Sequence, residues 1–327
     1  GQVGVLSSTI FGGVSGSAVA DASAIGSLLI PWQKRLGYPP AFSAATLAAA
    51  ATIDILIPPS IPMILFALSS NTSVAALFVA GILPGLMMCV GFMAVCWWVG
   101  RRRNFPRETA RLDWSRFRTQ LLYASPALVL PVLIVVFLRF GVATPTEVAV
   151  LSTLYAGVVS AAIYRDLGLQ RLHRCVVEAG LATGVVLLVI MSSAAIGWLL
   201  TFDRMPDGVV SWAQANLSSG WSVILLMNLL MLVCGMFIDL PAAVLLLTPV
   251  FVPLANAIGM DLVQLGIMMT VNLAIGLYTP PVGTTLFITS AVAKVKVGET
   301  VRELGPFYLV AFVVLALVSY VPALIFK

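Results

Sequence analysis

Long apolar runs separated by short polar connectors dominate the chain. Uninterrupted runs lie at about 80–100, 121–140, 145–163, 178–201 and 304–326. None of them alternates apolar and polar side chains as the strand of a membrane barrel does. Because a helix of about 20 apolar residues spans a bilayer and keeps its backbone hydrogen bonds internal, the pattern predicts an all-α integral membrane protein.

Four further apolar stretches are interrupted. Stretches 1–32 and 220–256 contain short polar breaks, and we expect each to form a re-entrant helical hairpin that returns to the side it entered from. Segments 42–70 and 263–293 each contain two adjacent prolines. Since proline ends or kinks a helix, these two segments are predicted to cross as broken transmembrane helices.

The basic residues indicate how the chain is oriented. With the hairpins in place, every lysine and arginine except Arg139, Arg204 and Lys327 falls on one side. The positive-inside rule makes that side cytoplasmic, including the loop 101–120, and places the C-terminus in the periplasm.

Composition agrees with a membrane protein. Hydrophobic residues make up 60% of the 327 positions and charged residues 9%, against roughly 45–50% and 25% in soluble domains. The net charge of +5 comes from connectors rather than from a basic face interleaved with aromatic residues, so no nucleic-acid partner is expected. The four cysteines include no CxxC pair, so no redox or metal role is expected for them.

An internal repeat links the two interrupted regions. Shifting the chain by 222 positions superposes Gly13 on Gly235, Pro31 on Pro253, Gly37 on Gly259, Pro58 and Pro59 on Pro280 and Pro281, and Pro84 on Pro306. Residues that dictate backbone shape match while the side chains between them mostly differ, as an old duplication would leave them. An odd number of crossings separates the hairpins, so the repeat is inverted, which is the plan of many secondary transporters.

The repeat divides the chain into three parts. Residues 1–84 form the first repeat, with hairpin 1 and its broken helix; 85–140 form connecting scaffold helices with the Arg-rich cytoplasmic loop; 141–327 form the second, inverted repeat. Residues 141–222 precede hairpin 2 and would need about 80 counterparts before residue 1. The first repeat is therefore N-terminally incomplete, and the sequence predicts an N-terminally truncated fragment.

The adjacent prolines predict ion sites. Proline has no amide hydrogen, so carbonyls about four residues earlier, at Asp54 and Ile55 and at Gly276 and Leu277, are expected to lose their helical partners. Free carbonyls at the end of a half-helix suit a small hard cation such as sodium, and the half-helix that follows directs amides at an anion. Hydroxyls and glycines gather near both breaks, although a single Ser or Thr more often bonds its own helix.

These considerations give three sets of candidate residues. Sodium site 1 comprises Ser15, Ser17, Asp54, Ile55, Pro58 and Ser60; sodium site 2 comprises Asp239, Gly276, Leu277, Thr279, Pro281 and Thr284; the substrate site comprises Gly16, Ser60, Gly283, Thr284 and Thr285.

Carboxylates in apolar segments are costly and are therefore functional candidates. Asp21 and Asp239 lie at predicted hairpin tips, where either could ligate a cation or lock the tip. Glu147, near the start of a span, is better explained by a favourable interaction with the helix dipole.

Five segments together carry a family resemblance: FGGVSGSAVADASAIGSLLIP, ATIDILIPPSIP, LFVAGILPG, GMFIDLPAAVLLLTPVFVP and NLAIGLYTPPVGTTLF. They resemble the large membrane (permease) subunit of tripartite ATP-independent periplasmic (TRAP) transporters over essentially the whole chain. The resemblance implies an elevator-type, Na+-coupled importer of a small organic acid, such as a C4-dicarboxylate or a sialic acid, in the bacterial inner membrane. It also implies two partners, a small four-helix membrane subunit and a periplasmic substrate-binding protein.

Carried over by position, the family's sodium sites fall on Ser15, Ser17 and Asp239 and on the turns 54–59 and 276–281. One position departs from the family pattern. Asp54 stands where family members usually have glycine, as its own repeat partner Gly276 does. An added carboxylate beside a cation site could alter ion affinity or proton coupling.

Other functions remain to be distinguished. Another sodium-coupled anion symporter or antiporter with inverted hairpins would work without a binding protein. An intramembrane hydrolase would need a base near a buried serine, but the sole histidine, His173, and Lys34, Lys294 and Lys296 all fall in predicted loops. A passive channel fits poorly with paired hairpins, so an enzyme or a channel is not expected.

The candidate sites predict a selective effect on ion coupling. Replacing Ser17 or Asp239 with alanine should weaken the sodium dependence of uptake more than it affects folding, because a cation ligand is lost. Uptake measured across a sodium titration tests this, and unchanged sodium dependence in both variants would count against the assignment.

Overall fold

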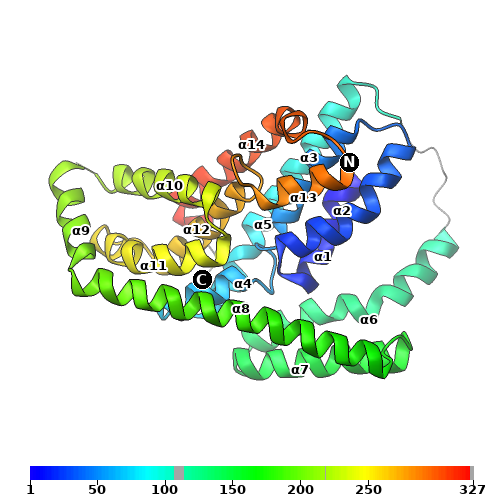
Figure 1. Cartoon of the computed structure of the whole chain (residues 1–327), viewed down its shortest axis with the longest axis horizontal. Helices are drawn as coiled ribbons and strands as arrows, with labels where there is room; N and C mark the ends of the chain where they lie inside the picture. Colours follow the sequence, from blue (N-terminus) through cyan, green and yellow to red (C-terminus); the bar gives the residue numbers. More distant parts are fainter. Residues whose placement is uncertain (107–113, 218, 325–327) are drawn as a thin grey trace.

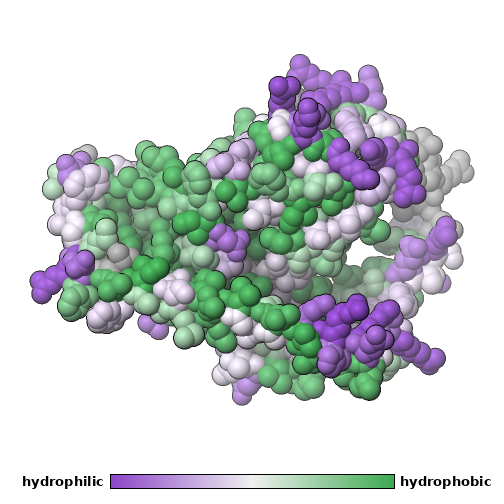
Figure 2. All heavy atoms as spheres, in the orientation of Figure 1, coloured by the Kyte–Doolittle hydropathy of each residue, from purple (hydrophilic) through white to green (hydrophobic). Residues whose placement is uncertain are grey.

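A computed structural model describes residues 1–106, 114–217 and 219–324, and all regular elements in those ranges are helices. Seven of these helices are long and apolar enough to cross a membrane. The prediction of an all-α membrane protein is thus confirmed at this level. Figure 2 shows hydrophobic residues over the middle of the visible face, with hydrophilic residues gathered towards its ends.

The first repeat begins with a helical hairpin. Helices α1 (Gln2–Ser15) and α2 (Ala18–Arg35) are joined by a tight turn. A broken helix follows, with α3 (Pro40–Ala50) continued by the short 3-10 helix η1 (Ala51–Ile53), and then α4 (Ile61–Ser70) beyond the prolines. The Pro58–Pro59 and Pro280–Pro281 peptide bonds are both cis.

The middle of the chain forms long helices, of which α5 packs on α1, α12 and α14, and α8 packs on α11. The bounds are α5 (Val74–Arg102), α6 (Trp114–Arg139), α7 (Pro145–Val158) with the π-helical turn η2 (Val159–Ile163), α8 (Leu169–Phe202) and α9 (Met205–Asn216). Helices α6, α7 and α8 are largely exposed along their apolar lengths. They lie together along one side of the molecule (Figure 1).

The second repeat reproduces the first. Its elements are α10 (Gly220–Phe237), α11 (Leu240–Ala257), α12 (Leu262–Gly276), α13 (Thr284–Ala293) and α14 (Val297–Tyr320), followed by the 3-10 turn η3 (Pro322–Leu324).

The predicted offset of 222 positions describes this correspondence closely. Helix α11 has the bounds of α2 shifted by that offset. Gly37 and Gly259, which the offset pairs, both have positive φ, at 86° and 69°. The duplicated Gly and Pro positions therefore mark the same backbone turns in both units.

The two repeats interlock rather than lie side by side. Helix α13 of the second repeat packs on α2 and α3 of the first, and α4 of the first packs on α11 of the second. The two hairpins approach each other from opposite ends of the molecule, and their tips point towards its centre (Figure 1). Opposed hairpins of this kind are the arrangement expected of an inverted repeat.

Helices α3 and α12 form the centre of the core. Almost every residue of α3, and all of α12 from Gln264 to Gly276, is buried. A helix that is apolar or small-sided all round is suited to such a position. The first break, which follows α3 and η1, is therefore held away from the surface of the protein, whereas Pro281 and Val282 of the second break are exposed.

Three predicted boundaries are wrong. Helix α8 begins at Leu169 instead of about 178, so His173 is helical and exposed rather than in a loop. Lys34 lies in the last turn of α2. Helix α9 was not expected, and α6 takes up the end of the loop predicted at 101–120. Arg107, Arg111 and Lys327, used to orient the chain, lie outside the described residues.

Helix α10 packs on the end of α12 through two glycines. A Cβ added at Gly276 would lie 2.4 Å from the carbonyl oxygen of Gly235. We expect Gly276→Ala to destabilise the protein by about 1–3 kcal/mol, because the helices must separate. Gly180→Ala is the matched control, since nothing lies within 4 Å of that position. Thermal unfolding in detergent compares the two, and equal stabilities would contradict the close contact.

Candidate functional site

Both hairpin tips and both breaks meet at one small cavity of about 90 Å³. The first repeat contributes residues 16–19 of the hairpin 1 tip together with Ile55, Ile61 and Pro62. The second repeat contributes residues 239–241 of the hairpin 2 tip and Leu277. Segments more than 200 residues apart in the sequence therefore form one pocket, as the repeat predicted.

The tip of hairpin 1 depends on a glycine. Gly16 ends α1 with φ of 64°, a left-handed conformation that favours glycine. A Cβ at this position would lie 2.5 Å from the carbonyl oxygen of Pro59. Ser17 then caps α2, its hydroxyl accepting a hydrogen bond from the amide of Ala20 at 3.4 Å. Gly16 thus brings the tip into direct contact with the first break.

Asp54 holds this tip through its side chain. One carboxylate oxygen accepts a hydrogen bond from the amide of Gly16 at 3.2 Å, and the other accepts from the amide of Ser17 at 3.1 Å. Gly12 of α1 packs directly on Asp54, because a Cβ there would lie 2.7 Å from the Asp54 Cα. Ser15 also lies beside the carboxylate. The Asp54 carboxylate therefore holds the tip with one hydrogen bond on each of its two oxygen atoms.

The carbonyls at the breaks are less free than expected. The Ile55 carbonyl accepts a hydrogen bond from the Ser60 hydroxyl at 2.6 Å. The Gly276 carbonyl accepts from the amide of Thr279 at 3.0 Å, and that of Leu277 accepts from the amide and hydroxyl of Thr285 at 3.0 and 2.9 Å. The expectation that these three carbonyls lack partners is wrong, because two hydroxyls and two backbone amides from other positions replace the helical donors. Each carbonyl oxygen has two lone pairs, so Ile55 and Gly276, with one donor each, retain acceptor capacity.

The second break contains a cavity of ionic size. Its volume is about 10 Å³, and Asp239, Gly276, Leu277 and Thr284 line it, with Gly283 and residues 235–238. About this volume is needed to hold one water molecule. The Thr284 hydroxyl is buried and has no hydrogen-bond partner. Four of the six residues predicted for sodium site 2 therefore converge, and their oxygen atoms fit a hard cation.

The remaining predicted residues have other surroundings. The Thr279 hydroxyl donates to the carbonyl of Ile275 at 2.6 Å, a bond within its own helix. The Thr285 hydroxyl also donates to the carbonyl of Ala48 at 3.1 Å and so ties the two repeats together. Neither they nor Pro281 line the two cavities, so their roles as ligands stay predictions.

The lining of the central cavity carries one ionisable side chain, that of Asp239. No lysine, arginine or histidine lines it or the small cavity at the second break. Oxygen atoms and backbone groups therefore dominate the site, and its only formal charge is negative.

A polar pair, formed by the buried Asn272 and the half-buried Asn228, was missed by sequence reasoning. Asn272 of α12 donates through its side-chain amide to the carbonyl and the side-chain oxygen of Asn228 in α10, both at 2.9 Å. Asn228 in turn donates to the Ser319 hydroxyl of α14 at 3.0 Å. An asparagine within a long apolar run was the available signal, since such a side chain needs a buried partner.

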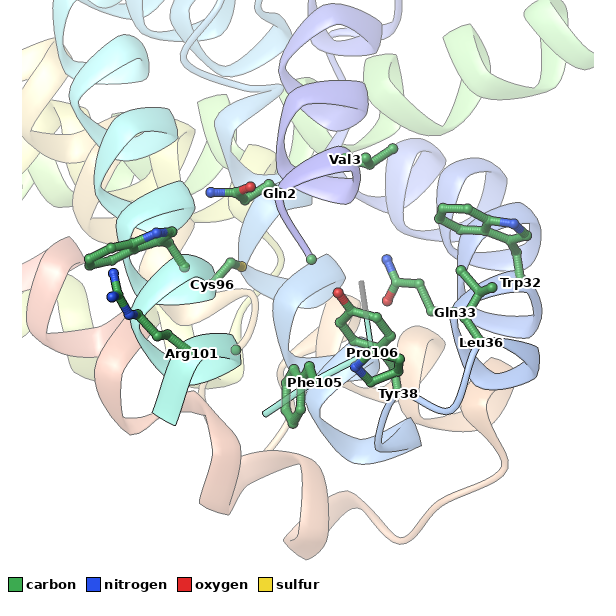
Figure 3. Close-up of a pocket in the computed structure, with 13 residues that line it drawn as sticks. Gln2, Val3, Trp32, Gln33, Leu36, Tyr38, Cys96, Arg101, Phe105 and Pro106 are labelled. Atoms are coloured by element: carbon green, nitrogen blue, oxygen red, sulfur yellow. The ribbon is translucent and has the colours of Figure 1, made fainter. Parts of the chain in front are cut away.

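A larger cavity lies elsewhere, with a volume of about 580 Å³. It opens between the start of α1, the end of α2 and the end of α5, with Gln33, Tyr38 and Arg101 among its side chains (Figure 3). It contains none of the residues predicted for the ion or substrate sites.

Comparison with known proteins agrees with this architecture. Residues 1–324 match the family model "Tripartite ATP-independent periplasmic transporter, DctM component". An uncharacterised protein, y4mL, of Sinorhizobium fredii is 59% identical over 98% of this chain and 76% of its own length. The C4-dicarboxylate TRAP transporter large permease protein DctM of Pseudomonas aeruginosa is 36% identical, over 98% and 74%. The sialic acid TRAP transporter large permease protein SiaM of Vibrio cholerae is 35% identical, over 98% and 75%.

The bonds from Asp54 predict how the tip of hairpin 1 moves. Asp54→Ala leaves the Ser17 amide without a partner, at a cost of about 1–3 kcal/mol, which corresponds to roughly 5- to 150-fold faster local hydrogen exchange. Hydrogen–deuterium exchange of peptides covering residues 12–20 measures this. Asp54→Asn retains one acceptor, so its exchange rate should lie between those of wild type and Asp54→Ala. Asp203→Ala, at an exposed carboxylate, should leave the exchange rate of these peptides unchanged. Wild-type exchange in Asp54→Ala would rule out the role of these bonds.

Proposed function

Because this chain belongs to the DctM-component family of TRAP transporters, a family of transporters rather than enzymes, we propose that it is a large permease subunit that imports a small organic acid together with sodium ions. Its family and apolar helices make it a multi-pass membrane protein. The bacterial inner membrane, with the connector after α5 on the cytoplasmic side, is the location we propose.

The absence of a cationic side chain from the lining of the two cavities supports sodium coupling most directly. An organic acid is an anion, and Asp239 adds a second negative charge to the same cavity. Bringing like charges together in a site of low dielectric is unfavourable unless positive charge enters with them. Bound cations supply that charge, so substrate binding depends on the ions.

The geometry offers places for these ions. The cavity of about 10 Å³ at the second break, with Asp239 and the unpartnered Thr284 hydroxyl, is our proposed sodium site 2. Sodium site 1 would use the Ile55 carbonyl and the hydroxyls of Ser15, Ser17 and Ser60 at the first break. The amides at the start of α4 and α13 would face the carboxylate of the substrate.

The interlocked repeats support alternating access. Two opposed hairpins around one central cavity would give inward- and outward-facing states that are related by the pseudo-symmetry of the fold. We propose that the hairpins and broken helices move together as an elevator against a scaffold that includes α6, α7 and α8. The exposed apolar faces of these three helices would contact lipid and the small membrane subunit.

The relatives' names suggest the substrate class, since they specify C4-dicarboxylates and sialic acid. We propose that a periplasmic binding protein delivers a carboxylate of this kind.

Reconstituted uptake tests the proposal. The chain, co-reconstituted with its small membrane subunit, should accumulate a labelled C4-dicarboxylate or sialic acid only with an inward sodium gradient and the substrate-loaded binding protein. Choline replacing sodium is the control for ionic strength. Full uptake without the binding protein would favour the rival carrier class, and uptake that ignores sodium would refute the coupling.

A further inference from the structure

A tyrosine of α14 is bonded to the backbone of the second break. The Tyr308 hydroxyl donates a hydrogen bond to the carbonyl of Tyr278 at 2.9 Å. The two rings also stack, with centroids 5.2 Å apart and an angle of 17° between their planes. Tyr278 is fully buried, and it directly follows Leu277, which lines both the central cavity and the small cavity at the break. Helix α14 therefore contacts the break through a side chain that lines neither cavity.

The bonded carbonyl shares a peptide unit with an amide that bonds the proposed sodium site. A peptide unit is planar, and in its trans form the N–H points away from the C=O. The amide of this unit, that of Thr279, donates to the carbonyl of Gly276 at 3.0 Å. One rigid group is thus held at both ends, by the Tyr308 hydroxyl and by a carbonyl of proposed sodium site 2. Fixing this group therefore also limits the movement of the Gly276 carbonyl.

The Gly276 carbonyl has more acceptor capacity than its two neighbours. The Ile275 carbonyl accepts from an amide at 3.3 Å and from the Thr279 hydroxyl at 2.6 Å. The Leu277 carbonyl accepts from the amide and the hydroxyl of Thr285 at 3.0 and 2.9 Å. A carbonyl oxygen has two lone pairs, so both of these are fully used. Gly276, which lines the small cavity, has one lone pair left for an ion.

We propose that Tyr308 is a positioning residue for sodium site 2. It holds the peptide unit between Tyr278 and Thr279, so that the Gly276 carbonyl is already in its ligand position before the ion binds. This proposal rests on the proposed sodium-coupled transport. A ligand that is ordered in advance costs less to fix on binding, so the affinity for the ion is higher.

The first break has no such tyrosine. The repeat offset pairs Tyr308 with Leu86, which has no hydroxyl and is 48% exposed. The amide of Ile57, the counterpart of Thr279, donates to the carbonyl of Ile53 at 3.1 Å and so keeps the helical spacing of four residues. The effect of Tyr308 is therefore confined to one of the two proposed ion sites.

Thermal unfolding of the purified full chain in detergent tests this role without transport. Sodium chloride is titrated while choline chloride keeps the ionic strength constant. Tyr308→Phe keeps the stacked ring and removes only the hydroxyl. It should raise the sodium concentration for half-maximal stabilisation by about three- to tenfold, which corresponds to the loss of about one hydrogen bond. The unfolding temperature in choline alone measures the structural cost separately.

Tyr155→Phe is the matched control. Tyr155 of α7 is half-buried like Tyr308, and its hydroxyl donates to the carbonyl of Pro126 in α6 at 2.8 Å. Neither Tyr155 nor Pro126 lines a cavity at the breaks. Because the same kind of bond is lost, the unfolding temperature in choline should fall as in Tyr308→Phe, but the half-maximal sodium concentration should remain that of wild type.

A double variant tests whether the effect passes through sodium site 2. Thr284→Val removes a proposed ligand of that site. If Tyr308 acts through the same ion, Tyr308→Phe should change the sodium response of Thr284→Val by less than it changes that of wild type. Equal changes in both backgrounds would place the effect outside site 2 and overturn the proposal.

The outcomes separate the positioning role from the proposed function. A wild-type protein with sodium-dependent uptake, together with a Tyr308→Phe protein that is less stable but has the wild-type half-maximal sodium concentration, would overturn the positioning role alone. That result is the one expected of a purely structural bond. A wild-type protein whose uptake does not respond to sodium would overturn the proposed function itself.

Discussion

Polar groups that are shielded from water must find partners within the protein, and this requirement shapes the centre of the molecule. The prolines at each break remove amides from the helical ladder, and side chains replace them: Ser60 bonds the Ile55 carbonyl, and Thr285 bonds that of Leu277. At the tip of hairpin 1 the backbone instead supplies the partners of a side chain, since two backbone amides donate to the Asp54 carboxylate. A group that remains without a partner, such as the Thr284 hydroxyl, marks a place where a cation is useful.

Glycine and proline restrict the backbone directly, so the repeat offset that they define in the sequence also relates turns in the structure. Gly37 and Gly259 show this, since both occupy turns with positive φ immediately after the hairpins. Apolar runs predicted the long helices but not their ends. The start of α8 carries charged residues that look like a connector, and α9 is too polar to detect by hydropathy. The contact between Gly235 and Gly276 involves backbone alone, and the Asn228–Asn272 pair depends on which helix faces meet. Neither the glycine contact nor the asparagine pair can be predicted from the local pattern of apolar and polar residues.

The candidate sites were also predicted only in part. Residue types and spacing indicated which segments would meet, and the second break does bring Asp239, Gly276, Leu277 and Thr284 around one cavity. They did not indicate where individual hydroxyls would point. In the structure, the hydroxyls of Thr279 and Thr285 bond backbone carbonyls.

The two repeats also differ in how the hairpin packs on the break. The second closes the hairpin onto the break through glycines, whereas the first uses Gly12 against Asp54 and anchors the tip with a charge.

The interlocking of the repeats has a consequence for how the protein is made. The Thr285 hydroxyl bonds the Ala48 carbonyl across 237 residues of sequence, and α13 fills the space beside α2 and α3. During synthesis the first hairpin and its broken helix therefore emerge long before the element that completes them. Contacts of such large sequence separation form slowly. The early half must wait in the membrane, with its small-sided helices incompletely covered, until α13 has been synthesised.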